Sequence, residues 1–210
     1  SKEILTSTKS HSLSQSGRSF SHNKDCFVKA QSMSVAQRIW GLDWNKHLPS
    51  ICNGYTLEMS SYQEFLALKN DPEGFLITSA EVESNFVREL NDEAKNNYLR
   101  EMCDFFAFKR EGEIVGICIS EMMDWSTYYT RYIFVKKEHR SHGLTQFMSH
   151  FLESVLKQYK VEKIACDVSP ANYAQVARLS EIGWSYTGSV LSERFGANLR
   201  LTKFINSECQ

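Results

Sequence analysis

The chain has 210 residues and a formal net charge of −1, with 24 Lys and Arg against 25 Asp and Glu. This balance argues against a nucleic-acid-binding protein or a polybasic membrane-binding surface. No apolar run approaches the roughly 20 residues of a transmembrane helix, and the polar first residues predict no signal peptide. The six cysteines form no Cys-x-x-Cys pair, so we expect reduced thiols in a cytoplasmic protein and no metal centre.

Composition divides the chain into three parts. Residues 1–24 are rich in Ser and poor in apolar residues, which is typical of a tail that cannot form a core alone. The stretch up to residue 53 is mixed and contains Trp40 and Trp44, which indicates an irregular arm whose tryptophans pack on something else. We therefore predict a tail and arm over 1–53, a compact domain over 54–205 and a C-terminal tail over 206–210.

Seven β-rich runs predict the strands of one sheet. In chain order they lie at 55–59, 104–110, 113–121, 130–135, 161–168, 184–190 and 198–205. Helices are expected from Ser60 or Ser61 to the stop at Asp71-Pro72, at about 81–100, along 144–156, and from Pro170 to about Ile182, before Gly183.

Two of these signals are the clearest. Glu111-Gly112 joins two strands as a hairpin turn, and Val115, Ile117 and Ile119 alternate in the second strand. After residue 143, apolar residues recur at three- and four-residue steps along one helix. A hairpin followed by strand–helix–strand–helix–strand predicts an α/β (α+β) fold. Its sheet would be mixed, mostly antiparallel and of about six or seven strands, with helices on both faces.

Residues 132–145 carry the strongest functional signal. An apolar strand ending at Val135 leads into a basic turn, a glycine and the amphipathic helix. The first amides of a helix lack partners, and the helix dipole favours an anion there. Arg140 adds a permanent cation with forked donors, and Gly143 lets the backbone approach a ligand. The pattern predicts a phosphate-binding loop, but neither G-x-x-x-x-G-K-[ST] nor G-x-G-x-x-G occurs in the chain.

The segment Arg140-Ser-His-Gly-Leu-Thr145 resembles the Arg/Gln-x-x-Gly-x-Gly/Ala signature of the GNAT superfamily of N-acetyltransferases. A second stretch, from Asn172 to Gly183-Trp184, resembles the Asn-to-Gly-Phe helix that follows the fifth strand in this family. It is most similar to the branch that acetylates the N-termini of ribosomal proteins. The resemblance covers about residues 54–205. It implies the GNAT fold and direct attack of a primary amine on acetyl-CoA in a ternary complex.

The resemblance also implies which residues bind acetyl-CoA. The backbone of Ile133, Phe134 and Val135 would pair with the pantetheine arm as an added strand does. Asn172 would bond the pantetheine or the acyl region, although it can also simply cap its helix. Beside Arg140, the pyrophosphate would be held by the amides of Ser141, His142, Gly143, Leu144, Thr145 and Gln146. Thr145 departs from the Gly or Ala of the family, which puts the cofactor affinity in question.

The reaction requires that a proton leave the amine, and the sequence offers three groups for this step. Asp167 lies at the end of a strand, at the position of the Glu that N-terminal acetyltransferases use. Glu121 ends the strand predicted at 113–121 and would face the same cleft or solvent. Tyr129 stands where histone-type members carry a Glu, and its hydroxyl could orient a water molecule.

Protonation of the thiolate leaving group has no obvious donor in the sequence. Leu179 stands where the family usually has a tyrosine that acts as the general acid. The remaining candidates for the proton donor are Tyr173, Tyr186 and water. His139 and His142 flank the loop without a third ligand nearby, so we expect solvated histidines that help to hold a phosphate.

These features predict an acetyl-CoA-dependent N-acetyltransferase. Its acceptor would be a primary amine on a peptide or protein N-terminus, a lysine or a small molecule. The alternative is a degenerate GNAT module that binds acyl-CoA without turnover and serves as a sensor or scaffold. The expected partners are acetyl-CoA and the amine, without nucleic acid or membrane, for a monomer or homodimer.

Overall fold

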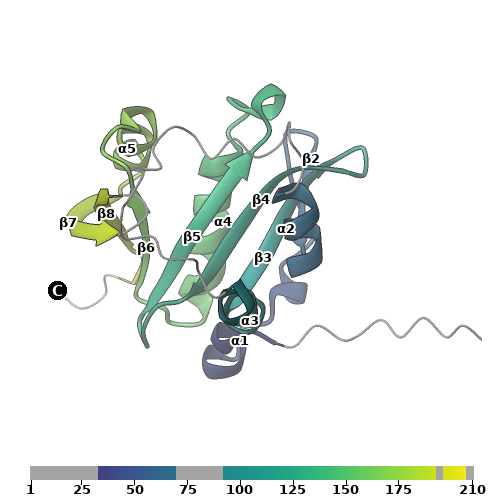
Figure 1. The fold of residues 1–210 in the computed structure, drawn as a ribbon, viewed down its shortest axis with the longest axis horizontal. Coiled ribbons are helices and arrows are strands. Elements are labelled where there is room, and N and C mark those ends of the chain that lie inside the picture. Colours follow the sequence, from purple (N-terminus) through teal and green to yellow (C-terminus); the bar gives the residue numbers. More distant parts are fainter. Residues whose placement is uncertain (1–32, 70–91, 193–195, 207–210) are drawn as a thin grey trace, which may run out of the picture. The chain divides into compact units, whose positions relative to one another are not determined.

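The computed structural model describes residues 33–69, 92–192 and 196–206. Their strands are β1 (Ser50–Cys52), β2 (Tyr55–Met59), β3 (Cys103–Arg110), β4 (Glu113–Met122), β5 (Thr127–Val135), β6 (Lys163–Val168), β7 (Ser185–Ser192) and β8 (Gly196–Phe204). They form one sheet in the order β1-β2-β3-β4-β5-β6-β8-β7 (Figure 1). Neighbours are antiparallel except for the parallel pair β5 and β6. The predicted mixed sheet is confirmed, with eight strands in the described residues because β1 adds an edge strand to β2.

The helices of the described residues are α1 (Val35–Trp40), α2 (Tyr62–Lys69), α3 (Asp92–Met102), α4 (Leu144–Gln158) and α5 (Tyr173–Glu181). The helix predicted at 81–100 is seen from Asp92 onward, whereas its first part and the Asp71-Pro72 stop lie outside the described residues. The start predicted at Pro170 is wrong. The helix begins at Tyr173 because the Asn172 side chain accepts the Gln175 N–H at 3.3 Å and caps it there.

Helices cover both faces of the sheet, as predicted. Phe106 and Phe108 of β3 pack in one apolar cluster with α1 and α4, whereas Phe105 packs in a second cluster with α2 and α3. Figure 1 shows α2 and α3 in front of the sheet and α4 behind it. Because both faces are covered, β4 is buried at every position from Val115 to Glu121, and not only at the alternating apolar positions.

Local signals account for several boundaries. The Ser61 hydroxyl accepts the Glu64 N–H at 3.1 Å and Glu64 accepts the Ser61 N–H at 3.0 Å, which is a capping box at the start of α2. The hairpin turn has φ values of 53° at Glu111 and 84° at Gly112, as a two-residue turn between twisted strands requires.

The packed core begins upstream of residue 54, where the sequence analysis placed the start of the domain. Leu42 and Trp44 are each 1% exposed and lie in the cluster behind the sheet. The Trp44 ring meets Phe106 edge-on, with ring centroids 4.9 Å apart. The arm before residue 54 is therefore part of the same core, because its tryptophan fills space between the sheet and α4.

A buried carboxylate ties this arm to the sheet. Asp104 of β3 is 2% exposed and accepts hydrogen bonds from the Tyr128 hydroxyl at 2.7 Å and from Nε2 of Gln37 on α1 at 3.0 Å. Burial raises the pKa of Asp104 to about 6, although these hydrogen bonds oppose the shift.

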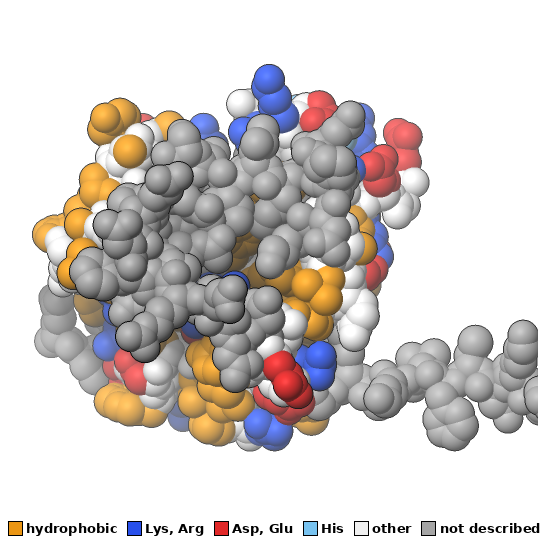
Figure 2. All heavy atoms as spheres, viewed as in Figure 1, with side chains coloured by type: hydrophobic (Ala, Val, Ile, Leu, Met, Phe, Trp, Pro, Cys, Tyr) orange, Lys and Arg blue, Asp and Glu red, His pale blue; other side chains and the backbone are white. Residues whose placement is uncertain are grey.

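The surface of the described residues carries both signs of charge. In Figure 2, basic and acidic side chains lie interspersed around the rim of the face that α2 and α3 cover. No helix in the described part of the chain is both long and apolar enough to cross a membrane.

We expect Gly116→Ala to lower the free energy of unfolding by about 1–3 kcal/mol. A Cβ at Gly116 would lie 2.8 Å from the Phe134 carbonyl oxygen on the neighbouring strand, so β4 and β5 would have to separate. Urea unfolding measures this loss. The matched control is Gly188→Ala on β7, where a Cβ would meet nothing within 4 Å. Equal stability of the two variants would contradict the prediction.

The stability should also depend on pH through Asp104. Its folded-state pKa of about 6 lies above the ordinary 3.8, so its contribution is fully present below about pH 4 and is lost as the pH rises through 6. We expect the stability of the wild type relative to Asp104→Asn to fall by roughly 2–3 kcal/mol between about pH 4 and about pH 8. Urea titrations of both proteins across this range measure the difference, and a constant difference would refute the assignment.

Candidate functional site

A groove opens where β5 parts from β6. The two strands pair only along β5 residues Thr127 to Thr130. On the other side, the register between β4 and β5 shifts between Ile119 and Ser120, which leaves Arg131 as an extra residue in β5. Such a bulge bends the strand that carries it. Beyond Thr130, β5 therefore turns away from β6, and a cavity of about 730 Å³ lies between β5, the loop after it, α4, the end of β6 and α5.

Beyond Thr130, β5 turns toward this groove an edge that has no partner strand in the described residues, and on this edge the Val135 oxygen already accepts a hydrogen bond from Nε of Arg140. The Lys136 N–H donates to the Val115 oxygen of β4 at 2.8 Å, and the Phe134 oxygen faces Gly116 of β4. Backbone groups of successive strand residues point to opposite sides, so those of Ile133 and Val135 face the groove. The Phe134 side chain packs in the apolar cluster with α2 and α3.

The loop after β5 delivers the start of α4 to the groove. Gly143 is the N-cap residue with a φ of 77°, and no side chain caps the helix in the described structure. The amides of Leu144, Thr145 and Gln146 precede the first helical hydrogen bond, which Phe147 donates to the Gly143 oxygen at 2.8 Å. The dipole of a 15-residue helix therefore points its positive end at the cavity.

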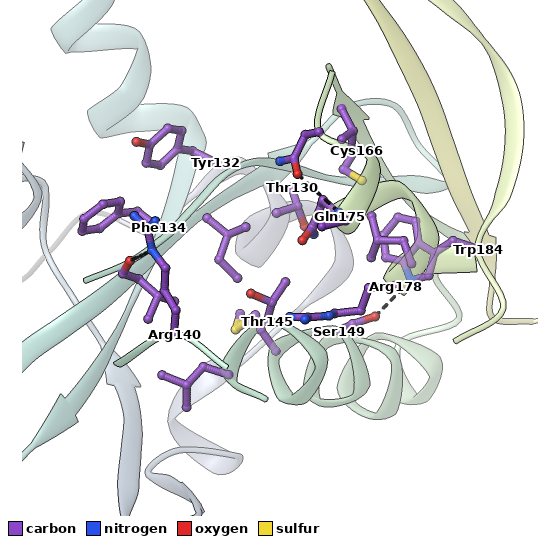
Figure 3. A pocket seen from close by; sticks show the side chains of 18 of the residues that line it. Thr130, Tyr132, Phe134, Arg140, Thr145, Ser149, Cys166, Gln175, Arg178 and Trp184 are labelled. Carbon is purple, nitrogen blue, oxygen red and sulfur yellow. Dashed lines mark hydrogen bonds between the residues drawn. The ribbon is translucent and has the colours of Figure 1, made fainter. Parts of the chain in front are cut away.

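Two arginines add charge to the groove. Arg140 is exposed, and its Nε donates to the Val135 oxygen at 3.0 Å, which fixes the guanidinium beside the end of β5. Figure 3 shows Arg178 reaching from α5 across the groove toward Thr145 on the first turn of α4. The sequence analysis missed Arg178. Its signal was its spacing from Asn172 and Gln175, since residues three apart share one side of a helix.

The other predicted binding residues are distributed as follows. Asn172 lines the groove at the start of α5, and Ser141 lines it with a φ of 65°. His142 is turned back on the loop, where its Nδ1 lies 2.9 Å from the Arg140 oxygen. The side chains of His142 and Gln146 are not part of the lining.

Of the three predicted proton acceptors, only Asp167 lines the groove. Arg200 of β8 binds it in a bidentate pair, with Nε 2.7 Å from Oδ1 and Nη2 2.8 Å from Oδ2. The Tyr129 hydroxyl donates to Oδ2 at 3.0 Å. Burial and the charge of Asp167 raise the pKa of Tyr129, so it stays a neutral hydroxyl. A carboxylate has about four acceptor positions, so one remains on Oδ1.

Glu121 lies outside the groove. Its carboxylate is buried and pairs with Arg131, and it accepts a hydrogen bond from the Cys103 thiol at 3.3 Å. Glu121 and Tyr129 are nevertheless direct neighbours across β4 and β5. The structure thus brings Tyr129 and Asp167 together. Glu121 lies beside Tyr129, but its carboxylate pairs with Arg131 and not with the Arg200 that binds Asp167.

A family model described as the Acetyltransferase (GNAT) family matches residues 65–184, which is more than half of the chain. The chain therefore belongs to the GNAT family of acetyltransferases. A search of curated proteins by sequence found no match.

Solved structures share the fold at low sequence identity. The ribosomal-protein-S18-alanine N-acetyltransferase from Escherichia coli has a TM-score of 0.55 at 13% identity, over 74% of this chain and 98% of that one. A putative acetyltransferase from Salmonella typhimurium with its cofactor acetyl-CoA has a TM-score of 0.54 at 11% identity, over 75% and 98%. A spermidine N-acetyltransferase from Vibrio cholerae has a TM-score of 0.53 at 15% identity, over 75% and 97%. Two of these neighbours are named for different acceptors, so the predicted likeness to the ribosomal-protein branch stays a prediction.

Proposed function

We propose that the protein is an acetyl-CoA-dependent N-acetyltransferase that acts on a primary amine. The observation that carries this proposal is the groove itself. It combines an unpaired strand edge, an uncapped helix N-terminus and two arginines in one cavity. A volume of about 730 Å³ lies within the usual range for cofactor-sized sites.

Acetyl-CoA has a pantetheine arm followed by a pyrophosphate, and the groove offers a strand edge followed by a helix N-terminus with two arginines. The backbone groups of Ile133 and the N–H of Val135 would pair with the amides of the pantetheine arm, as an added strand does. The amides from Ser141 to Gln146 would bind the pyrophosphate at the start of α4, between Arg140 and Arg178. Gly143 fits this role, because its φ of 77° is a backbone conformation that residues with a Cβ rarely adopt.

Acetyl-CoA supplies a thioester carbonyl, and the protein has to position an amine beside it. The Val135 region of β5 directs backbone N–H groups into the groove, where they can stabilise charge that develops on the carbonyl oxygen. Asp167 stands at the end of the neighbouring strand with one acceptor position left. We assign it the role of accepting the amine proton, directly or through one water molecule, while Arg200 and Tyr129 hold its carboxylate in place.

The acceptor is assigned only as far as a primary amine. One neighbour is named for a protein alanine and another for spermidine, so the fold serves both a peptide N-terminus and a small polyamine. For this chain we propose a peptide or protein amine, or a small amine, in a ternary complex with acetyl-CoA.

Calorimetric titration with acetyl-CoA and with CoA tests the binding step, and a thiol-release assay over a panel of amines tests the transfer. We expect micromolar binding of both ligands, and in the wild type release of CoA that depends on an amine. Arg140→Ala should weaken CoA binding by about threefold to tenfold without loss of stability, because the side chain is exposed and its terminal nitrogens would donate to the phosphates. Lys157→Ala on the last turn of α4 is the matched control. Failure of the folded wild type to bind either ligand would refute the proposal.

Asp167→Asn tests the assigned proton acceptor. At neutral pH we expect turnover to fall by at least about a hundredfold while CoA binding is retained. The loss should shrink as the pH rises, because the amine then loses its proton to solvent. Measuring kcat against pH for the variant and for Glu162→Gln, an exposed carboxylate just before β6, separates this role from a general effect of charge. An unchanged kcat would remove Asp167 from the chemistry.

A further inference from the structure

We infer that Tyr55 is a positioning residue of the groove. Its hydroxyl fixes His139 as the tautomer that carries its proton on Nε2, and His139 offers that N–H to a phosphate oxygen of the thioester substrate. This inference rests on the proposed function, because the phosphate is that of CoA. The motif of residues 140–145 contains neither residue, and Tyr55 lies on a different strand.

The contacts form a short chain that leads from the sheet to the groove. Nη1 of Arg110 donates to the Tyr55 hydroxyl at 3.2 Å, and the same hydroxyl lies 3.2 Å from Nδ1 of His139. The guanidinium of Arg110 also stands over the Tyr55 ring, 5.2 Å from its centroid. His139 belongs to the lining of the groove, whereas Tyr55 is 1% exposed.

The contact with Arg110 favours one direction for the hydrogen bond between Tyr55 and His139. Arg110 can only donate, so the Tyr55 oxygen is an acceptor toward it. The single proton of the Tyr55 hydroxyl is then free to be donated to Nδ1 of His139. A neutral imidazole whose Nδ1 accepts a hydrogen bond carries its proton on Nε2. Since Tyr55 occupies the Nδ1 side of the ring, the Nε2 side is left for the groove.

The same tyrosine holds the loop in place. Its ring meets the His139 ring edge-on at 5.8 Å and lies 5.7 Å from the His142 ring. Nδ2 of the nearby Asn53 donates to the His142 oxygen at 3.4 Å. The turn that begins the phosphate cradle is thus fastened to β2. A loop fixed before the ligand arrives loses less conformational entropy on binding.

Two readouts separate a positioning role from a purely structural one. The first needs no ligand. In the full chain labelled with ¹⁵N-histidine, at about pH 8, two-bond ¹H–¹⁵N correlations report which ring nitrogen of His139 is protonated, with His139→Gln used for assignment. We expect Nε2–H in the wild type and a mixture of tautomers in Tyr55→Phe. A mixture or Nδ1–H in the wild type would overturn the inference.

The second readout is the affinity for phosphate-bearing ligands. Tyr55→Phe keeps the buried ring and removes only the hydroxyl, so we expect CoA to bind about threefold to tenfold more weakly, and His139→Ala to lose at least as much. The matched control is Tyr159→Phe. Its hydroxyl lies 3.4 Å from Nε2 of His47, a second tyrosine–histidine pair at the opposite end of α4. This control should bind CoA as the wild type does.

Ligands that lack phosphates identify what His139 contacts. A loss seen with CoA and with 3′-dephospho-CoA assigns His139 to the pyrophosphate, whereas a loss seen with CoA alone assigns it to the 3′-phosphate. An equal loss with pantetheine, or no loss with CoA, refutes the inference while the wild type still binds CoA. Absence of binding by the wild type itself refutes the proposed function instead, and the tautomer measurement then still decides the role of Tyr55.

Discussion

The groove depends on one extra residue in β5, Arg131, at the point where β5 parts from β6. Arg131 has no partner in the register between β4 and β5, and the parallel ladder to β6 ends one residue earlier, at Thr130. Without this bulge the two strands would continue to pair and fill the groove with their own backbone. With it, the strand edge at Ile133 and Val135 is released for a ligand. The close approach of β4 at Gly116 meanwhile holds β5 firmly on its other side.

Two of the cations next to the groove, Arg131 and Arg200, each have an anion and an aromatic ring as neighbours. Arg131 pairs with Glu121 and lies 5.5 Å from the Tyr98 ring, and Arg200 pairs with Asp167 and lies 5.6 Å from the Tyr129 ring. Paired in this way, partly buried charges avoid much of the penalty of leaving water. The arrangement also holds Asp167 in one orientation at the end of β6, so the side chain assigned to proton transfer is placed before any ligand binds.

Local sequence patterns could predict the elements but not the contacts between distant segments. The apolar stripe of α4, the Glu111-Gly112 turn and the glycine before α4 are all properties of neighbouring residues, so they could be read from the sequence. The links from Tyr55 to His139, from Arg200 to Asp167 and from Trp44 to Phe106 join residues far apart in the chain. They follow from sheet order and packing, which no local pattern encodes. The bulge at Arg131 was missed for the same reason, because register is a property of two strands together.

The departures from the family pattern on α5 also have a physical explanation. Asn172, Gln175 and Arg178 line the groove, while the Leu179 side chain is 4% exposed and packs in the core at its floor. Tyr173 and Tyr186, the substitutes considered for a proton donor, are 77% and 60% exposed and are not among the groove-lining residues.

A proton donor for the thiolate is less necessary than a proton acceptor for the amine. A thiol has a pKa of about 8.5 and an alkyl ammonium one of about 10.4, so near neutral pH the thiolate can leave unassisted while the amine must first lose a proton. Leu179 is therefore compatible with the proposed reaction, in which the chemical demand falls on the Asp167 side of the groove.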